Sequence, residues 1–437
     1  MAIRTSTRGF IIAGILALAI LYTISYRYRS SAISSFNAHN LVPSLLHSKP
    51  SQHDFVARAL EHEVSDPFNI AAISNLCRNR PPREDVIVSC NPGTGGVGNI
   101  RSYMLHCTRF AMEAGASMIL PHFHRRSKSD LFELNGEMGD FEHFFDREHY
   151  IETVHAACPH IKVYENPEEE WTMGNMEIPH WPLAINVSSL SNPSPWRLEL
   201  DSWFETSTAG MKKPVIIASG DPGRDRAVMD DGIDFYYNIG RILKFRPDAR
   251  RLAALCMAEI NRRFNLHMDP EQNLFENAYM GAHLRTSSDA VKAGWNPDFE
   301  KQTDWYINQT LRHNLPVIFA AGGNDVDLER FANKAFKRGI YVVNKYDLLR
   351  GNDLRELDNF LWDQRGLVDF EILLKASQYG GYARSSFSHN VAFRRHFVSK
   401  VEDPFADPDN HFADEISVVY GRFDAGWEDE GVRTMWP

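Results

Sequence analysis

The sequence predicts an α/β fold in which two parallel sheets carry helices on both faces. Short apolar segments rich in β-branched residues alternate with helical patterns along most of the 437 residues, as they do in βαβ units. This alternation occurs in two halves, which are separated near the helical segment 250–264. A chain of this length holds about two or three domains. We therefore expect two domains, 65–270 and 271–437, that face a cleft at the carboxyl ends of their strands.

The first half contains a strand–loop–helix pattern of the kind that positions a binding loop. The apolar segment 85–90 ("DVIVSC") is predicted as a strand, a glycine-rich loop follows it, and the segment 100–115 is predicted as a helix. An earlier helix is expected at 53–64 ("HDFVARALEHEV"). Further strands are predicted at 117–121 ("SMILP"), 160–165 ("HIKVYE"), 182–186 ("PLAIN") and 214–220 ("PVIIASG").

The second half repeats the alternation. Strands are predicted at 278–285 ("AYMGAHLR"), 315–322 ("LPVIFAAG") and 339–344 ("GIYVVN"), and helices at 327–338 and 368–380. Asp369 is expected to begin the second of these helices, and Gly380 and Gly381 to break the chain after it. Ser385 is expected to open one more helix, which runs to Arg395.

The N-terminus predicts a membrane anchor. Residues 9–26 contain no charged side chain, and arginines flank them on both sides. A helix of this length spans about 27 Å, enough for a thin membrane of the secretory pathway. We expect a short tail at 1–8, a transmembrane signal anchor at 9–26 and a flexible, serine-rich stem at 27–64. The alternative is a cleaved signal peptide.

With this anchor, the expected protein is a single-pass type II protein of the ER or Golgi membrane with a luminal body. Asn186 and Asn308 lie in glycosylation triplets and are candidate glycosylation sites. The chain has five cysteines. In an oxidising lumen, Cys77 and Cys90 can close a short loop around the polar segment between them, or both can be ordinary buried thiols.

The charge of the chain excludes nucleic acid as a partner, because a net charge of −10 opposes a phosphate backbone. The tail after Val401 carries ten Asp or Glu residues and two Arg. It also contains an apolar segment and two tryptophans, so we expect it to pack back on the folded body. No cysteine or histidine spacing typical of a metal site occurs, and His122 and His124 are expected in a loop. We therefore expect neither a metal nor a cofactor.

The loop after the first predicted strand matches a dinucleotide-binding fingerprint. Gly93, Gly95 and Gly98 form the pattern G-x-G-x-x-G between a strand and a helix. The fingerprint also needs an acidic residue about 20 positions further on, at the end of the second strand. The segment 121–125 contains none, which disfavours a nicotinamide-dependent dehydrogenase. The loop then offers a helix N-terminus to another phosphate-bearing ligand, or it is only a tight turn that needs glycine.

An arginine stands at the end of the first predicted strand of the second half. His283 and Arg285 are two residues apart, so they share a face of this strand, and Asp289 follows in the loop. A guanidinium suits a diphosphate, because it donates to two oxygens at once and stays charged. The alternative is an edge-strand arginine that forms an ion pair with Asp289.

Hydroxyl groups stand at the start of the helix that opens near Ser385. Ser385, Ser386 and Phe387 would form an anion site together with the free N–H groups of this helix. Asp369, upstream, can accept hydrogen bonds from a guanine edge. Taken singly, Ser385, Ser386 and Asp369 are explained equally well as helix caps. The pair Asp325 and Asp327 resembles a metal-binding D-x-D, but capping of a helix by Asn324 or Asp325 explains it better.

Four segments carry a resemblance to a known family: "GGVGNIRSYMLHCTRFAMEAGASMILP", "FEHFFDREHY", "GAHLRTSSDA" and "VDFEILLKASQYGGYARSSFSHNVAFRR". In this order they resemble the GDP-fucose O-fucosyltransferase superfamily, and most closely its fungal, membrane-anchored members. The resemblance covers roughly residues 70–400. It implies a GT-B fold, in which two Rossmann-like domains hold GDP-fucose between them, and an inverting transfer without a metal.

The resemblance also implies roles for single residues. Arg285 would bind the β-phosphate and the leaving group, and Asn99 would lie where donor and acceptor meet. The other residues would bind the donor: His283 and Asp289 along its site, Asp369 at the guanine, Ser385, Ser386 and Phe387 at phosphate and base, and Gly95, Gly96 and Gly98 in a loop slim enough for substrate. The spacing "TSSD" before Asp289 departs from the family, and Asn99 is no carboxylate, so no general base is named.

The expected function is therefore transfer of fucose from GDP-fucose to a hydroxyl of a protein or glycan acceptor. The acceptor is expected on the side of 65–270, and the nucleotide sugar on the side of 271–437. Two alternatives remain open at this point. One is an inactive nucleotide- or glycan-binding membrane protein with the same fold, and the other is a GT-B transferase that uses another nucleotide sugar.

Overall fold

The computed structural model describes residues 51–62, 68–91, 93, 95–128, 133–166, 194–218, 228–292, 294–295, 297–422 and 432–437. The predicted anchor at 9–26, the predicted strand at 182–186 and the candidate Asn186 lie outside the described residues. None of the described helices is both long and apolar enough to cross a membrane. Residues 50–437 form one compact unit.

The folded body starts before residue 65, at the helix that the sequence predicts over 53–64. Helix α2 (Gln52–Glu61) begins with a capping box, in which Ser51 and Asp54 bond each other's main chain. Its Phe55 is buried and contacts the ring of Phe275 at 6.2 Å. This helix falls within the stem expected at 27–64, so the C-terminal part of that stem belongs to the core.

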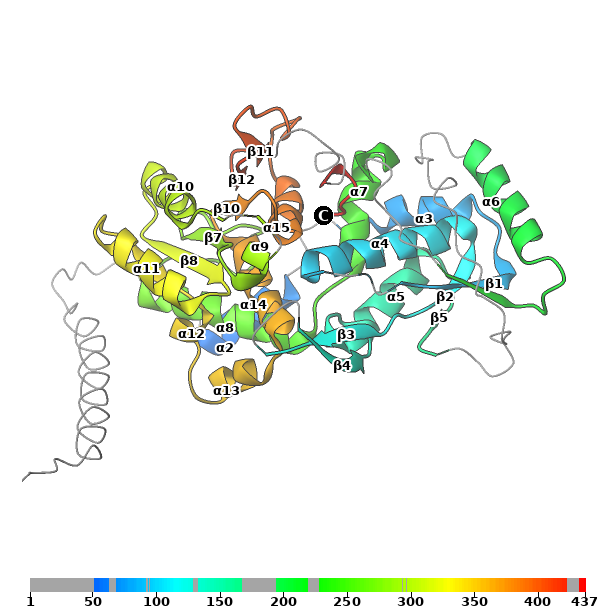
Figure 1. Ribbon diagram of the computed structural model, residues 1–437, viewed down its shortest axis with the longest axis horizontal. Helices are drawn as coiled ribbons and strands as arrows, with labels where there is room; N and C mark the ends of the chain where they lie inside the picture. Colours follow the sequence, from blue (N-terminus) through cyan, green and yellow to red (C-terminus); the bar gives the residue numbers. More distant parts are fainter. Residues whose placement is uncertain are drawn as a thin grey trace, which may run out of the picture. The chain divides into compact units, whose positions relative to one another are not determined.

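The first sheet is fully parallel, with the strand order β5–β2–β1–β6 (Figure 1). Its strands are β1 (Arg83–Ser89), β2 (Ala116–Ile119), β5 (Val163–Tyr164) and β6 (Val215–Ala218), which confirms the four strands predicted here within the described residues. The helices of this half are α3 (Ile70–Arg78), α4 (Val97–Ala114), α5 (Arg147–Ala157), α6 (Ser194–Ser207), α7 (Ile233–Ile239) and α8 (Pro247–Arg263). A short antiparallel hairpin, β3 (Phe123–Arg126) with β4 (Leu134–Gly139), follows β2. His124 therefore lies in a strand rather than in the expected loop.

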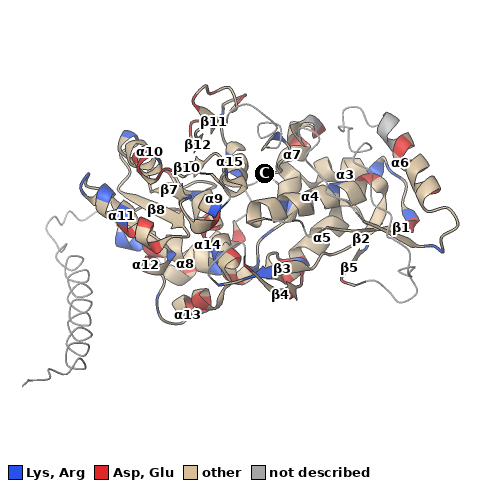
Figure 2. Ribbon diagram, viewed as in Figure 1, with Lys and Arg blue, Asp and Glu red and all other residues tan. Residues whose placement is uncertain are grey.

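The second sheet has the strand order β11–β12–β10–β7–β8–β9, parallel except for β11 at one edge. Its strands are β7 (Met280–Leu284), β8 (Val317–Gly322), β9 (Tyr341–Val343), β10 (Gln378–Tyr382), β11 (Asn410–Ala413) and β12 (Ser417–Tyr420). Its helices are α9 (Ser288–Lys292), α10 (Phe299–Arg312), α11 (Asp325–Phe336), α12 (Lys345–Leu348), α13 (Gly351–Asn359), α14 (Trp362–Lys375) and α15 (Ser386–His396). Charged residues gather on outer helices such as α11 and α13, whereas β7, β8 and β10 carry none (Figure 2). The α/β class with parallel sheets is confirmed.

Two predictions about the segment before α15 are wrong. Asp369 lies in the middle of α14 and does not begin a helix. Gly380 and Gly381 do not break the chain but lie inside β10, a strand with neighbours on both sides. A Cβ on Gly380 would lie 2.6 Å from the ring of Tyr306 in α10, and one on Gly381 would lie 2.7 Å from Cβ of Ser388 in α15. Glycine is needed here because these helices pack directly on the strand.

Helix α4 is enclosed on nearly all sides. Of its eighteen residues, all but Asn99 are buried. It ends at Gly115, which takes the left-handed conformation with φ of 67°. The chain's last residues cover part of it, since Trp436 is fully buried against the rings of His106, Phe235 and Tyr236. Asn99 is therefore the one residue of this helix that is not buried.

The cysteines pair differently from the hypothesis for Cys77 and Cys90. Cys77 bonds Cys158, which joins α3 to the end of α5, and Cys90 bonds Cys107, which joins the end of β1 to α4. Cys256 is free and buried. Strands and helices bring together cysteines that are distant in the sequence, so the spacing of the cysteines does not predict how they pair. The second disulfide closes the chain around the glycine loop.

Candidate functional site

A cavity of about 770 Å³ lies beyond the carboxyl ends of β7 and β8, which is where open parallel sheets bind ligands. The glycine loop, the first turn of α4 and the hairpin strand β3 form its other side. Of the residues singled out from the sequence, its wall includes Gly95, Gly96, Asn99, His283, Arg285, Asp289, Asp369, Ser385, Ser386 and Phe387. Gly98 lies beneath the loop and packs against α15. Residues nearly 300 positions apart thus share one pocket.

Arg285 is held rigidly at the end of β7. Its guanidinium donates to both carboxylate oxygens of Asp289, with an Nη1–Oδ1 distance of 2.7 Å. The side-chain amide of Gln302 binds the main chain of Arg285: it accepts from N at 2.9 Å and donates to O at 3.3 Å. The indole of Trp295 lies below the guanidinium, with its centroid at 5.2 Å. The ion pair expected as the alternative exists, but β7 is an inner strand and not an edge strand.

Asp289 is ionised in this arrangement. Burial pushes the pKa of its carboxyl upward, but the hydrogen bond and the charge of Arg285 outweigh burial and bring the pKa below its usual range. The hydroxyl of Ser287 donates to Oδ1 at 2.5 Å and acts in the same direction. Both members of this fixed ion pair line the pocket.

His283 is neutral at physiological pH. Burial, with the nearby charge of Arg285, lowers the pKa of its imidazole to about 3. Its Nδ1 lies 2.8 Å from the hydroxyl of Ser388, and its ring packs on Phe387 with centroids 4.6 Å apart. The hydroxyl of Tyr306 donates to the main-chain carbonyl of His283 at 2.7 Å. The end of β7 is thereby fixed to both α10 and α15.

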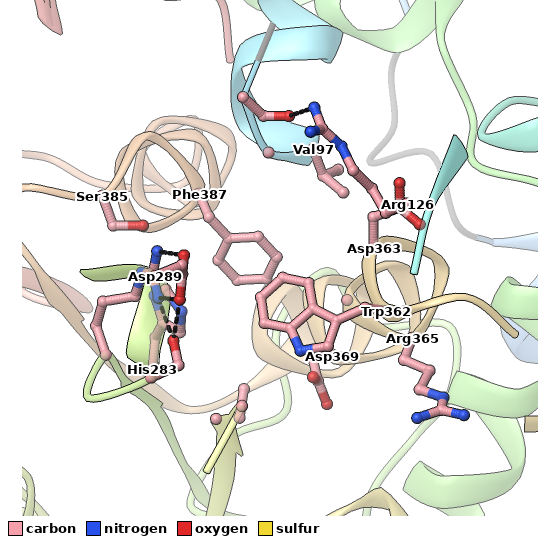
Figure 3. Close-up of a pocket in the computed structure, with 18 of the residues that line it drawn as sticks. Val97, Arg126, His283, Asp289, Trp362, Asp363, Arg365, Asp369, Ser385 and Phe387 are labelled. Carbon is pink, nitrogen blue, oxygen red and sulfur yellow. Dashed lines mark hydrogen bonds and ion pairs between the residues drawn. The ribbon is translucent and has the colours of Figure 1, made fainter. Parts of the chain in front are cut away.

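Two helix N-termini meet at the pocket. A Cβ on Gly98 would lie only 2.7 Å from the main-chain N of Phe387, so the start of α4 touches the start of α15. Ser385 is the N-cap of α15 but its side chain makes no capping bond, which leaves the hydroxyl available. Free N–H groups and helix dipoles at such ends attract anions. Ser385 and Phe387 project from this end toward the side of His283 and Asp289 (Figure 3).

The glycine loop takes conformations that only glycine adopts readily. Gly93 and Gly95 have φ of 73° and 91°. A Cβ on Gly95 would lie 2.4 Å from Nδ2 of Asn99, so the side chain of Asn99 folds over the loop. Here glycine serves both the turn and the close approach of Asn99.

Asp369 forms a buried ion pair with Lys345 at 2.5 Å. Burial raises the pKa of the Asp369 carboxyl, and the Lys345 ammonium opposes that rise. Lys345 bonds only Oδ2, and Oδ1 has no hydrogen-bond partner among the described residues. A buried acceptor without a partner is costly, so this oxygen is available to an N–H group of a ligand in the pocket.

Sequence reasoning missed several wall residues. Lys345 and Trp362 lie on the wall, and neither stands in a recognisable motif. Three further cations, which we call the basic corner, are Arg126, Lys128 and Arg365. Arg126 and Lys128 come from β3 and the residues after it, and Arg365 from the first turn of α14. The positive charges of the segment 125–128 ("RRSK") are visible in the sequence. Nothing local shows that this segment reaches the pocket.

The described residues contain no group of three or more His, Cys, Asp or Glu side chains that could hold a metal ion. Asn324 caps α11 by accepting from the main-chain N of Asp327 at 3.2 Å, and Asp327 pairs with Arg330. The D-x-D segment is thus part of a helix start. Asn308, the second glycosylation candidate, is exposed on α10.

The fold and the site together define an α/β protein with a pocket at the carboxyl ends of parallel strands, lined by arginines and by two helix N-termini. The family model described as GDP-fucose protein O-fucosyltransferase (O-FucT) matches residues 86–398. The chain belongs to this family, and it is a glycosyltransferase.

Solved structures of fucosyltransferases resemble the chain at low identity. POFUT1 in complex with GDP-fucose is 16% identical, with 72% of this chain and 96% of that chain covered and a TM-score of 0.45. NodZ alpha-1,6-fucosyltransferase with GDP is 14% identical, with 71% and 92% covered and a TM-score of 0.40. A mutant of FUT1 from Arabidopsis thaliana with GDP is 11% identical, with 80% and 78% covered and a TM-score of 0.38. A search of curated proteins finds no match.

Proposed function

We propose that this chain transfers fucose from GDP-fucose to a hydroxyl of an acceptor, with inversion at C1 and without a metal, on a GT-B fold. The observation that carries the proposal is Arg285, a buried and rigid guanidinium that lines the same pocket as the start of α15. A cation and a helix N-terminus on one pocket suit a diphosphate. Family membership supports the choice of GDP-fucose as donor.

The free polar atoms of the pocket suggest how the donor lies. Oδ1 of Asp369 would accept from the guanine edge, because it is buried and lacks a partner among the described residues. The diphosphate would lie between Arg285 and the N–H and hydroxyl groups of Ser385 and Ser386. The fucose would then point toward Asn99, the one residue of α4 that is not buried. Placed this way, the guanine and the diphosphate each meet a complementary group.

The reaction breaks the bond between C1 of fucose and the β-phosphate oxygen and forms a bond between C1 and the acceptor oxygen. The acceptor hydroxyl loses its proton, and GDP leaves with the electron pair of the broken bond. Negative charge builds on the β-phosphate while C1 gains oxocarbenium character. Arg285 and the start of α15 stabilise that charge without having to reorganise, since Asp289 and Ser287 already fix the guanidinium and Gln302 fixes the main chain of Arg285.

We also propose a luminal location. Two disulfides in the folded body fit an oxidising compartment, and the apolar segment 9–26 suits a type II anchor in the ER or Golgi membrane. In this setting the acceptor would be a protein or glycan of the secretory pathway. The family description favours a protein acceptor.

The test is the variant Arg285→Lys. Loss of one such electrostatic contact typically lowers kcat by about 10²–10³-fold, so fucose transfer and release of GDP from GDP-fucose should fall by that factor while thermal stability stays close to wild type. Arg338→Lys, at an exposed position in the turn after α11, is the matched control. Near-normal turnover by Arg285→Lys would contradict the proposed mechanism.

A nucleotide-sugar panel and a chelator complete the experiment. Stabilisation by another GDP-sugar but not by GDP-fucose would indicate that the other GDP-sugar is the donor. Binding of GDP-fucose without any release of GDP would favour an inactive binding protein. The anomeric configuration of the product, read by NMR, tests inversion. Full activity in excess EDTA is expected.

A further inference from the structure

The basic corner consists of cations that share the cavity wall but have no acidic partner. Nη2 of Arg126 donates to the carbonyl of Gly95 at 3.1 Å. Nη2 of Arg365 and Nζ of Lys128 both donate to the carbonyl of Asp358, at 2.9 and 3.5 Å. Among the described residues, none of these three cations forms an ion pair. Their only hydrogen-bond acceptors are main-chain carbonyls.

Such a cluster is unfavourable without an anion. Lys128 and Arg365 share one carbonyl, so two like charges are held close together, which costs free energy. The nearest carboxylate on the wall, Asp363, is buried beside His143 at 3.6 Å, and one of its oxygens accepts from the main-chain N of Gln364. Its charge favours the protonated form of Arg126, although burial as the larger effect lowers the pKa of that guanidinium. A ligand that brings negative charge to Lys128 and Arg365 would relieve this repulsion.

The donor does not supply that charge. Its diphosphate is assigned to Arg285 and the start of α15, and its fucose is uncharged. In the view of Figure 3, Arg126 and Arg365 lie on the opposite side of the pocket from Ser385 and Asp289. The charge must therefore come from the second substrate.

The cations form a row that suits an extended chain. Arg126 ends β3, Lys128 follows two residues later, and both line the cavity. Arg365 reaches the carbonyl of Lys128 itself at 3.3 Å. Leu134 of β4 is 50% exposed and also lines the cavity, which adds an apolar contact next to the row. An extended polypeptide advances about 3.3 Å per residue and can present successive carboxylates to such a row.

We infer that the acceptor is a polypeptide whose target Ser or Thr is flanked by Asp or Glu side chains, and that the basic corner binds these carboxylates. The inference rests on the proposed fucosyl transfer and adds the class of its acceptor. It makes Lys128 and Arg365 determinants of acceptor choice, whereas donor binding depends on Arg285, Asp369 and the start of α15.

The experiment uses pairs of Ser/Thr peptides that differ only by Asp→Asn and Glu→Gln around the target. With wild-type enzyme, kcat/KM should be about 10-fold higher for the acidic member, as expected for two partly exposed charge contacts, and the ratio should shrink at high salt. In Lys128→Gln/Arg365→Gln the ratio should fall close to 1. Lys337→Gln/Arg338→Gln, the same charge change in the exposed turn after α11, should keep the wild-type ratio.

Binding of GDP and slow hydrolysis of GDP-fucose are measured in parallel and separate the two proposals. If neither occurs, the proposed function fails, whatever the acceptor is. If both occur but acidic and amide peptides react equally, the inference is overturned. Reaction with a uronic-acid or sulfated oligosaccharide, in place of every peptide, overturns the polypeptide class. A reversed ratio in Lys128→Glu/Arg365→Glu, with lysine-flanked peptides preferred, supports the inference most directly.

Discussion

Gly98→Ala tests the contact between the two helix starts at the pocket. The added Cβ would lie 2.7 Å from N of Phe387, 2.7 Å from C of Ser386 and 2.8 Å from O of Ser386. All three are main-chain atoms, so no side chain can turn aside. Because ordinary contacts begin near 3.4 Å, α4 and α15 must separate by roughly 0.7 Å or more.

The expected size of the effect follows from this displacement. Overpacking of this kind costs about 1–3 kcal/mol, and the better helix propensity of alanine returns about 0.5–1 kcal/mol. The net loss of stability should be at most about 2.5 kcal/mol. The start of α15 also moves away from a bound phosphate, and weakening one charge-assisted hydrogen bond costs about 1.5–3 kcal/mol. The Kd for GDP should therefore rise by about 10- to 100-fold.

Calorimetric titration with GDP and a thermal unfolding scan measure the two effects separately. Asn333→Ala is the control, because this residue is exposed on α11 and does not line the cavity. It should keep or slightly raise stability. Wild-type affinity for GDP in Gly98→Ala would refute the idea that this contact positions the anion site.

The remaining predictions concern the buried pair, the pocket histidine and the loop disulfide. Asp369→Asn leaves the Lys345 ammonium buried without its partner and should cost about 3–5 kcal/mol; Lys345→Met in addition should restore stability but not GDP affinity, and recovery of both would show that Asp369 does not meet the base. Because the pKa of His283 is about 3 when folded and 6.5 when unfolded, the unfolded chain binds more protons between these values. In that range, for each unit by which the pH falls, wild type should lose up to about 1.4 kcal/mol of unfolding free energy relative to His283→Gln. If urea unfolding gave the two proteins parallel dependences of stability on pH, this prediction would be contradicted. Cys90→Ala/Cys107→Ala opens a link of 17 residues and should lower stability by about 3 kcal/mol, measured against reduced and oxidised wild type.

The parts of the site that sequence reasoning located are those with a local pattern. His283 and Arg285 follow an apolar strand with a spacing of two, and Ser385 precedes a helix, so strand and helix rules place them at element ends. The carboxyl ends of parallel strands share one edge of a sheet. This geometric rule brings Arg285 and Ser385 to one pocket although 100 positions separate them.

The parts that were missed depend on contacts between distant segments. Lys345 is recognisable only once Asp369 is known to lie opposite it inside the fold. Gly380 was interpreted as a chain break because glycine in a sequence does not show whether it ends an element or makes room for a neighbour such as Tyr306. The pairing of Cys90 with Cys107 likewise follows from α4 lying over β1. Each is a tertiary effect that overrides a local signal.

The enclosure of α4 limits how this protein can be altered. A substitution at any residue of the helix other than Asn99 meets packed neighbours, so its effect on activity is confounded with damage to the core. Asn99 is partly exposed on the cavity wall, so a change there alters the pocket with the least damage to the scaffold. A library that aims at new donor or acceptor preference should begin there.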